Sequence, residues 1–367
     1  MEEELIYGEI LTQQLESLEY KQLEALISIS DFSGENPFPM PSVADLVTRL
    51  FNGEAIADPL GFFQTLAGFF LSETFSNLIL FSEIIAICMI ASLLKSSSGT
   101  LGESTASNVG QMVCNYSAIA ICISSFTIMY QVASVAIDEM VGFMQALLPV
   151  MVTLLVGSGA AATGAVMNPV VLIAISVFAT VAHAVILPAV FLSCAFFMIN
   201  SLTESDYIKK LATFIRRLAI FIMGLGVMVF SGLTAIQGLV TVPADSVITK
   251  AAKYSIGNFV PVIGGFAADS LDLIKSCTLV IKSAVGVFGV LAVLFILVVP
   301  LVKLLSAMLI YKVAAIIIEP IGNRNMSDCM NEVGNAMVSL ALVVFLVALM
   351  FLIFIAMMAS FGAKGLI

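Results

Sequence analysis

The chain has 367 residues, of which 60% are hydrophobic and only 11% are charged, whereas an ordinary soluble domain carries about 25% charged residues. Too few polar side chains remain to cover a soluble fold of this size, so a soluble enzyme is excluded and most of the chain is expected to lie in lipid. The net charge of −10 arises in residues 1–74, where thirteen acidic side chains face only Lys21 and Arg49, and such an acidic region argues against nucleic-acid binding, which requires a basic surface.

Residues 1–73 form an acidic N-terminal region in which we expect helices but no membrane crossing. Residues 2–30 place leucines at helical spacing among Glu and Gln, which predicts an amphipathic helix that is either simply solvated or binds a partner. Residues 60–72 are apolar but too short to cross a bilayer, so an interfacial helix is predicted. The chain begins with Met and three Glu residues instead of a basic signal-peptide start, so either a signal is removed or the first spanning helix directs targeting.

Residues 74–367 are predicted to form the membrane domain, because they contain uncharged stretches long enough to cross a bilayer. The predicted fold is all-α, a polytopic transmembrane helical bundle of six to nine crossings, with eight as the preferred number. Residues 304–318 are a doubtful crossing, because Lys312 interrupts them. The expected crossings are residues 74–94, 104–137, one or three within 140–203, 218–244, 283–302 and 333–363.

The stretch 140–203 contains no Asp, Glu, Lys or Arg over 64 consecutive positions. As one helix it would extend roughly 96 Å, about three times the hydrocarbon thickness of a bilayer. It must therefore fold back, either as three short crossings or as one crossing with a re-entrant hairpin. The candidate breakers are Pro149, the Gly157–Gly164 run, Pro169 and Pro188.

The orientation of the chain is predicted from its basic residues. The densest cluster lies in residues 204–217, which the positive-inside rule assigns to a cytoplasmic loop. The number of crossings on either side then places residues 1–73 and residues 245–282 outside the cytoplasm. Residues 245–282 are too polar to span and are expected to form an amphipathic or re-entrant segment, although four lysines there disfavour the outer side.

Two ionisable residues stand inside apolar stretches and are candidates for a transport path. Glu83 lies midway along a predicted crossing and should face a helix interface or a water-filled path, with structural pairing favoured over ion relay. His183 is the single histidine of the chain, and a neutral histidine bonded to a neighbouring helix is favoured over a functional one. Without paired catalytic or ligating groups near either residue, we predict no catalytic centre, no metal site and no cofactor.

Two glycine-rich elements are the other candidates for a path or a helix interface. The first runs from Pro149 to Pro169, where small residues at four-residue spacing permit close helix packing or an irregular backbone. The second is the apolar, glycine-broken stretch at residues 258–265. The candidate residues of the two elements are Pro149, Gly157, Gly159, Gly164, Asn168 and Pro169 in the first, and Asn258, Pro261, Gly264 and Gly265 in the second.

The same elements resemble the stage III sporulation protein AE family over roughly residues 75–360. The resemblance is carried by Leu147-Leu148-Pro149, by the Gly157–Gly164 run followed by Asn168-Pro169, and by Asn258-Phe259-Val260-Pro261-Val262-Ile263-Gly264-Gly265 with the segment 269–289 after it. It implies no catalytic residues.

The resemblance implies a permease-like, multi-pass component of the complex that joins the mother cell to the engulfed forespore and supports late forespore gene expression. The implied location is the mother-cell membrane around the forespore. The implied partners are other proteins of the stage III sporulation A operon (an ATPase, small membrane proteins and ring-forming proteins) and, indirectly, stage II sporulation protein Q, with a homo-oligomer as a further option. Two alternatives stay open: a stand-alone ion-coupled secondary transporter, and a scaffold that recruits ring-forming partners without transport.

Overall fold

The structure of the protein is a computed structural model that describes residues 59–101, 105–202, 208–259, 264–321 and 324–360. Every element in these residues is helical, so the predicted all-α fold is confirmed. The elements in chain order are α4 (Pro59–Ser76), α5 (Leu78–Leu101), α6 (Thr105–Gly157), α7 (Ala161–Val181), the π-helix η1 (Ala182–Ile186), α8 (Leu187–Ser201), α9 (Lys209–Phe259), α10 (Gly264–Ile318), the 3₁₀-helix η2 (Glu319–Ile321) and α11 (Arg324–Ser360).

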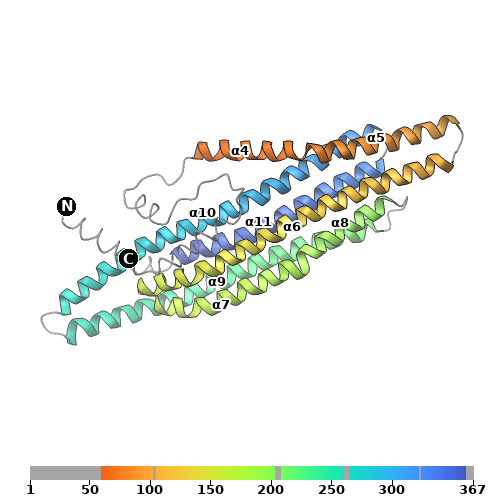
Figure 1. The fold of residues 1–367 in the computed structure, drawn as a ribbon. Helices are drawn as coiled ribbons and strands as arrows, with labels where there is room; N and C mark the ends of the chain where they lie inside the picture. Colours follow the sequence, from red (N-terminus) through yellow and green to blue (C-terminus); the bar gives the residue numbers. More distant parts are fainter. Residues whose placement is uncertain (1–58, 102–104, 203–207, 260–263, 322–323, 361–367) are drawn as a thin grey trace.

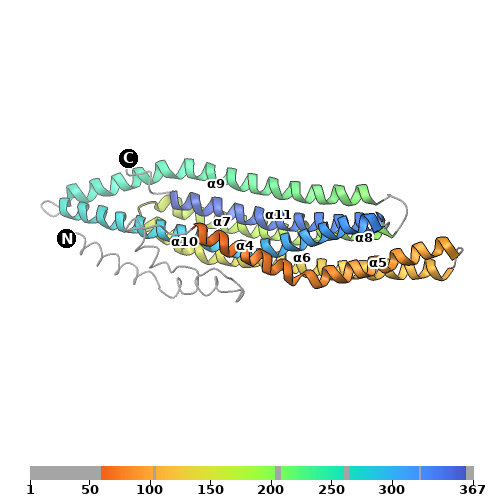
Figure 2. The same ribbon diagram turned by 90° about the horizontal axis from the view of Figure 1, so that it is seen from above.

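The helices pack side by side along one long axis, and the hairpin of α5 and α6 extends beyond the other helices at one end (Figures 1 and 2). Within the described residues, six helical stretches are long and apolar enough to cross a membrane. Six lies within the predicted range of six to nine, but the preferred number of eight is wrong. The six stretches are Gly61–Leu93, Val109–Gly157, Ala162–Ser201, Lys209–Ile236, Ile274–Ile318 and Arg324–Ser360.

The uncharged stretch 140–203 turns back once, so both of its predicted arrangements are wrong. Its first part completes α6, which runs unbroken through Pro149, and its second part forms α7, η1 and α8 in line. Membrane helices tolerate proline because the carbonyl that it leaves free can be satisfied locally. Residues 104–203 therefore make two passes.

The predicted interfacial helix at residues 60–72 does not exist as a separate element. It is part of α4, and the backbone N–H of Phe81 donates to Asn77 O while that of Asn77 donates to Glu73 O, so α4 leads into α5 with one irregular residue between them. The helix also crosses the predicted domain boundary at residues 73 and 74. The remainder of the N-terminal region, residues 1–58, lies outside the described residues.

Two predicted loops are also helical. The basic residues of 204–217 lie mainly on the first turns of α9, which begins at Lys209, while residues 203–207 lie outside the described part. Residues 245–259 complete α9 and residues 264–282 begin α10, so the amphipathic or re-entrant segment is replaced by the ends of two long helices. Residues 304–318, which were predicted as a doubtful crossing, continue α10 as regular helix.

Helix α11 lies against α6, α8, α9 and α10 and forms the centre of the bundle. Its sequence alternates small and large apolar residues, and buried side chains follow one another along its whole length. Ring pairs join it to its neighbours, as between Phe354 and Phe230 of α9, whose centroids are 6.1 Å apart. All six cysteines are free thiols, five of them buried, so they fill space as small apolar side chains.

Candidate functional site

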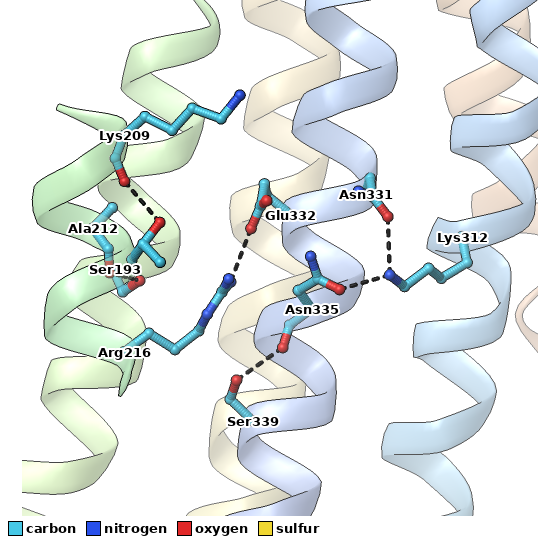
Figure 3. A network of polar contacts seen from close by, with 10 residues as sticks. Ser193, Lys209, Ala212, Arg216, Lys312, Asn331, Glu332, Asn335 and Ser339 are labelled. Atoms are coloured by element: carbon cyan, nitrogen blue, oxygen red, sulfur yellow. Dashed lines mark hydrogen bonds and ion pairs between the residues drawn. The ribbon is translucent and has the colours of Figure 1, made fainter. Parts of the chain in front are cut away.

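The most polar part of the bundle interior lies where α9, α10 and α11 meet (Figure 3). Arg216 of α9 donates to Glu332 of α11 across 2.9 Å, and the two side chains are only 13% and 19% exposed. The Arg216 guanidinium also lies 5.1 Å from the ring centroid of Phe197 on α8, within the range of a cation–π contact. This ion pair therefore connects three helices.

On the opposite side of α11, the Lys312 ammonium of α10 donates to two amide oxygens. The distances are 2.9 Å to Asn331 and 2.6 Å to Asn335, and both asparagines lie on one face of α11 because they are four residues apart. Gly334 makes room for this lysine, since an added Cβ would lie 3.3 Å from its Cγ. Lys312 is thus held against α11 by two asparagines and a glycine that lie within five consecutive residues of that helix.

A second polar group lies where α6 meets the π-helix η1. His183 Nε2 is 3.0 Å from Asp138 Oδ1, and its Nδ1 is 3.4 Å from the Ser134 hydroxyl. Nε2 makes no directed hydrogen bond, so its approach to the carboxylate is an oblique ion-pair contact. Ser134 and Asp138 share one face of α6, and η1 supplies the wider turn that carries His183, a feature often found at functional sites.

No acidic residue lies near His183 along the chain, but packing brings Asp138 of α6 next to it. The two side chains lie within ion-pair distance, and Asp138 remains 68% exposed. The next residue of α6, Glu139, lines a pocket of about 270 Å³ together with Gln131 of α6 and Lys303 of α10. Charged and polar side chains thus gather at this level of the bundle from α6, α10 and η1.

The glycine run after α6 forms the single turn between α6 and α7. Ala160 N–H donates to Leu155 O and Gly159 N–H donates to Val156 O, which is the Schellman arrangement for ending a helix. Gly159 has a φ of 91°, a conformation that favours glycine.

Gly157 and Gly164 permit close packing around the same turn. An added Cβ would lie 3.2 Å from Thr278 Cγ2 at Gly157, and 2.9 Å from Val156 Cγ2 at Gly164. The geometry thus supports the packing interpretation of the run, and a role in a path stays a prediction.

The other predicted site residues lie apart from these groups. Glu83 is exposed on α5, so the expectation that it faces a helix interface is wrong for this chain alone. Pro149 and Pro169 are exposed inside α6 and α7, so the predicted break after Asn168 does not occur. Asn258 is placed in the last turn of α9, and Gly264 and Gly265 open α10. The surroundings of these three residues and of Asn168, and all of Pro261, lie outside the described part of the chain.

Sequence reasoning missed the partners of these charged residues. Lys312 was treated only as an interruption of a crossing, and Arg216 only as part of a loop. A charge inside an otherwise apolar helix usually has a partner on another helix, and Glu332 and the Asn331/Asn335 pair were available in the sequence. Among the described residues, no group of three or more His, Cys, Asp or Glu is placed to hold a metal ion.

Comparison with known proteins places the chain among sporulation proteins. The family model for stage III sporulation protein AE matches residues 41–362. Stage III sporulation protein AE of Bacillus subtilis (strain 168) is 27% identical over 314 residues, which cover 86% of this chain and 79% of that protein. No solved structure matches. Because the family model covers nearly the whole chain, the protein belongs to the stage III sporulation protein AE family.

Proposed function

We propose that this chain is the permease-like membrane component of a transport or channel complex between mother cell and forespore, and that late forespore gene expression requires it. The observation that carries the proposal is the family match over residues 41–362, which includes all six candidate membrane helices.

The proposed location is the mother-cell membrane that surrounds the forespore, with the N-terminal region outside the cytoplasm. The proposed partners are an ATPase, small membrane proteins and ring-forming proteins encoded with it, together with stage II sporulation protein Q on the forespore side. No catalytic step is assigned to this chain. In this arrangement the ATPase would supply energy and the bundle would supply the membrane path.

Complementation tests the proposal. A sporulating strain that lacks its own family member would express this chain, and a fluorescent reporter of late forespore transcription would be measured after engulfment. We expect the wild-type chain and Arg217→Gln to restore the signal, and Glu332→Gln to restore less of it. Normal membrane insertion with no reporter recovery by the wild-type chain would count against the proposal, provided that the strain's own family member restores expression in parallel.

An ion-coupled transporter is a second candidate, favoured by the contact between His183 and Asp138. A proton shared by these groups could couple ion movement to a change in the packing of α6 against α7 and α8. Purified protein in liposomes would then move protons or a solute without partner proteins, and His183→Gln would abolish that flux. A wild-type chain that shows no flux in liposomes but supports forespore expression in cells would remove this candidate.

A further inference from the structure

Three helices of the bundle are far longer than a bilayer requires. α6, α9 and α10 contain 53, 51 and 55 residues, which correspond to roughly 80 Å each, whereas the hydrocarbon core of a bilayer is about 30 Å thick. Only part of each helix can therefore lie in hydrocarbon. The distribution of charge along aligned helices identifies that part.

Contacts between helices define which residues share a level. On the side of the turn between α6 and α7, the rings of Phe143 and Phe288 have centroids 6.4 Å apart, and Gly289 packs against Leu147. These pairs align the second half of α6 with the first half of α10.

The same level continues through the remaining helices. Gly286 lies against Ala359 of α11, so this part of α10 is beside the end of that helix. Gly226 of α9 lies against Phe178 of α7, and Thr234 of α9 donates to the Met357 sulfur. Five helices therefore pass this part of the bundle together.

At this level the sequences contain no exposed charge. Residues 283–302 of α10 are uncharged between Lys282 and Lys303, and these 20 positions span about 30 Å. Residues 140–157 of α6 and all of α7 are uncharged as well. Lys282 has no exposed surface, and Glu139 and Lys303 face one pocket at the other boundary. The layer matches the hydrocarbon core in thickness and in composition.

The other half of the bundle carries charges at much shorter intervals along α10. Lys312 of α10 lies nine positions after Lys303, and Glu319 of η2 lies seven positions after Lys312, which corresponds to about 14 Å and about 10 Å. Arg217 is exposed on α9 within the same region. Residues 105–137 of α6 carry no charge, so the closely spaced charges of α10 and the exposed Arg217 are what distinguish this half of the bundle from the layer.

We propose that the hydrocarbon core crosses the bundle between the level of Glu139 and Lys303 and the level of Lys282. The remainder of the bundle, with α5 and the first half of α6, then projects from the membrane on the side of the basic residues at the start of α9. The placement is independent of the proposed transport function. It assigns lipid acyl chains as the contact of α7 and of the middle of α9.

The projecting hairpin of α5 and α6 is the sharpest place to test this inference. Cys122 of α6 contacts Met330 in the second turn of α11, and α6 begins 17 positions before Cys122, so the start of α6 extends beyond the neighbouring helices (Figure 1). Tyr116 in this part is 56% exposed, and Leu93 of α5 is 67% exposed. Because the hairpin itself is apolar, lipid burial and projection predict opposite results there.

The chain contains no tryptophan, so a single introduced tryptophan reports its own surroundings. Four exposed positions allow the substitution without disturbing the interior. Met228→Trp (73% exposed) and Ile173→Trp (64%) probe the proposed layer, whereas Tyr116→Trp (56%) and Phe214→Trp (61%) probe the projecting part. The full chain would be reconstituted in vesicles of phosphatidylcholine with and without bromine on the acyl chains.

We expect blue-shifted emission and several-fold stronger quenching by bromolipid for the two tryptophans in the layer. The two projecting tryptophans should emit at longer wavelength, resist bromolipid and be quenched by aqueous iodide. Bromolipid quenching of Tyr116→Trp equal to that of Met228→Trp would overturn the placement, as would iodide quenching of Met228→Trp. Two positions in each part keep the comparison valid if one variant misfolds.

Discussion

Replacing Glu332 by Gln should destabilise the bundle more than any comparable change at the helix surface. The variant keeps the size of the side chain and removes only its charge, so the buried Arg216 guanidinium loses its counter-ion. At the observed separation of 2.9 Å, Coulomb attraction is about 6 kcal/mol at an effective dielectric constant of about 20. Desolvation of the two ions offsets most of this gain, so the intact pair itself contributes little net stability.

Removal of one partner leaves the desolvation cost of the other uncompensated, which gives an expected loss of about 3 kcal/mol. Arg217→Gln is the matched control, because this neighbouring arginine is exposed and its loss should change stability by less than about 0.5 kcal/mol. The double variant Arg216→Met with Glu332→Leu should recover most of the stability, since neither charge then remains buried.

The assay is reversible unfolding of purified protein in mixed micelles, followed by helical circular dichroism as the denaturing detergent is raised. A double-mutant cycle gives the coupling energy between Arg216 and Glu332. A Glu332→Gln variant as stable as Arg217→Gln would refute the reasoning, because the pair would then contribute no more than a surface contact. The reasoning would also be refuted if the double variant Arg216→Met with Glu332→Leu were less stable than Arg216→Met alone and Glu332→Leu alone.

Three further substitutions test the packing of the bundle by the same unfolding assay. Gly226→Val should cost about 1–3 kcal/mol by overpacking, because its Cβ would lie 2.8 Å from the Phe178 ring. Gly224→Val has open space around it and should cost less. Equal losses of stability would contradict the packing of Gly226 against Phe178. Gly159→Ala should lose about 1–2 kcal/mol because alanine resists the left-handed backbone, and an unchanged midpoint would argue against the turn. Lys312→Met should cost about 1 kcal/mol by removing the donor to two half-buried amide oxygens, and unaltered stability would show that these hydrogen bonds are not formed.

The fold class could be predicted from composition because an excess of uncharged residues leaves no alternative to helices in lipid. The number of passes could not, because a proline or a glycine run has two outcomes in a membrane helix. Pro149 and Pro169 are carried through continuous helices, whereas Gly159 ends one. Gly159 takes the left-handed backbone that the Schellman hydrogen bonds require, but other glycines stay inside helices, so the presence of a glycine does not by itself predict where a helix ends.

The candidate sites divide in the same way. His183 could be singled out as an ionisable residue in an apolar stretch, but its partner Asp138 lies 45 positions earlier, and only the packing of η1 on α6 brings them together. Glu83 was expected to be shielded, but it lies on the exposed face of α5 beside the fully buried Ile84. Partner identity on long helices depends on their register, which periodicity alone does not determine.

Native purification of the chain from sporulating cells tests the central claim most directly. An affinity-tagged copy that replaces the strain's own family member would be isolated in mild detergent after engulfment, and its partners would be identified by mass spectrometry. The account predicts that an ATPase and ring-forming proteins co-purify in fixed ratio with the chain, and that Arg217→Gln leaves this set unchanged. A functional chain that is isolated alone, or only with copies of itself, would contradict its assignment to a multi-protein transport complex.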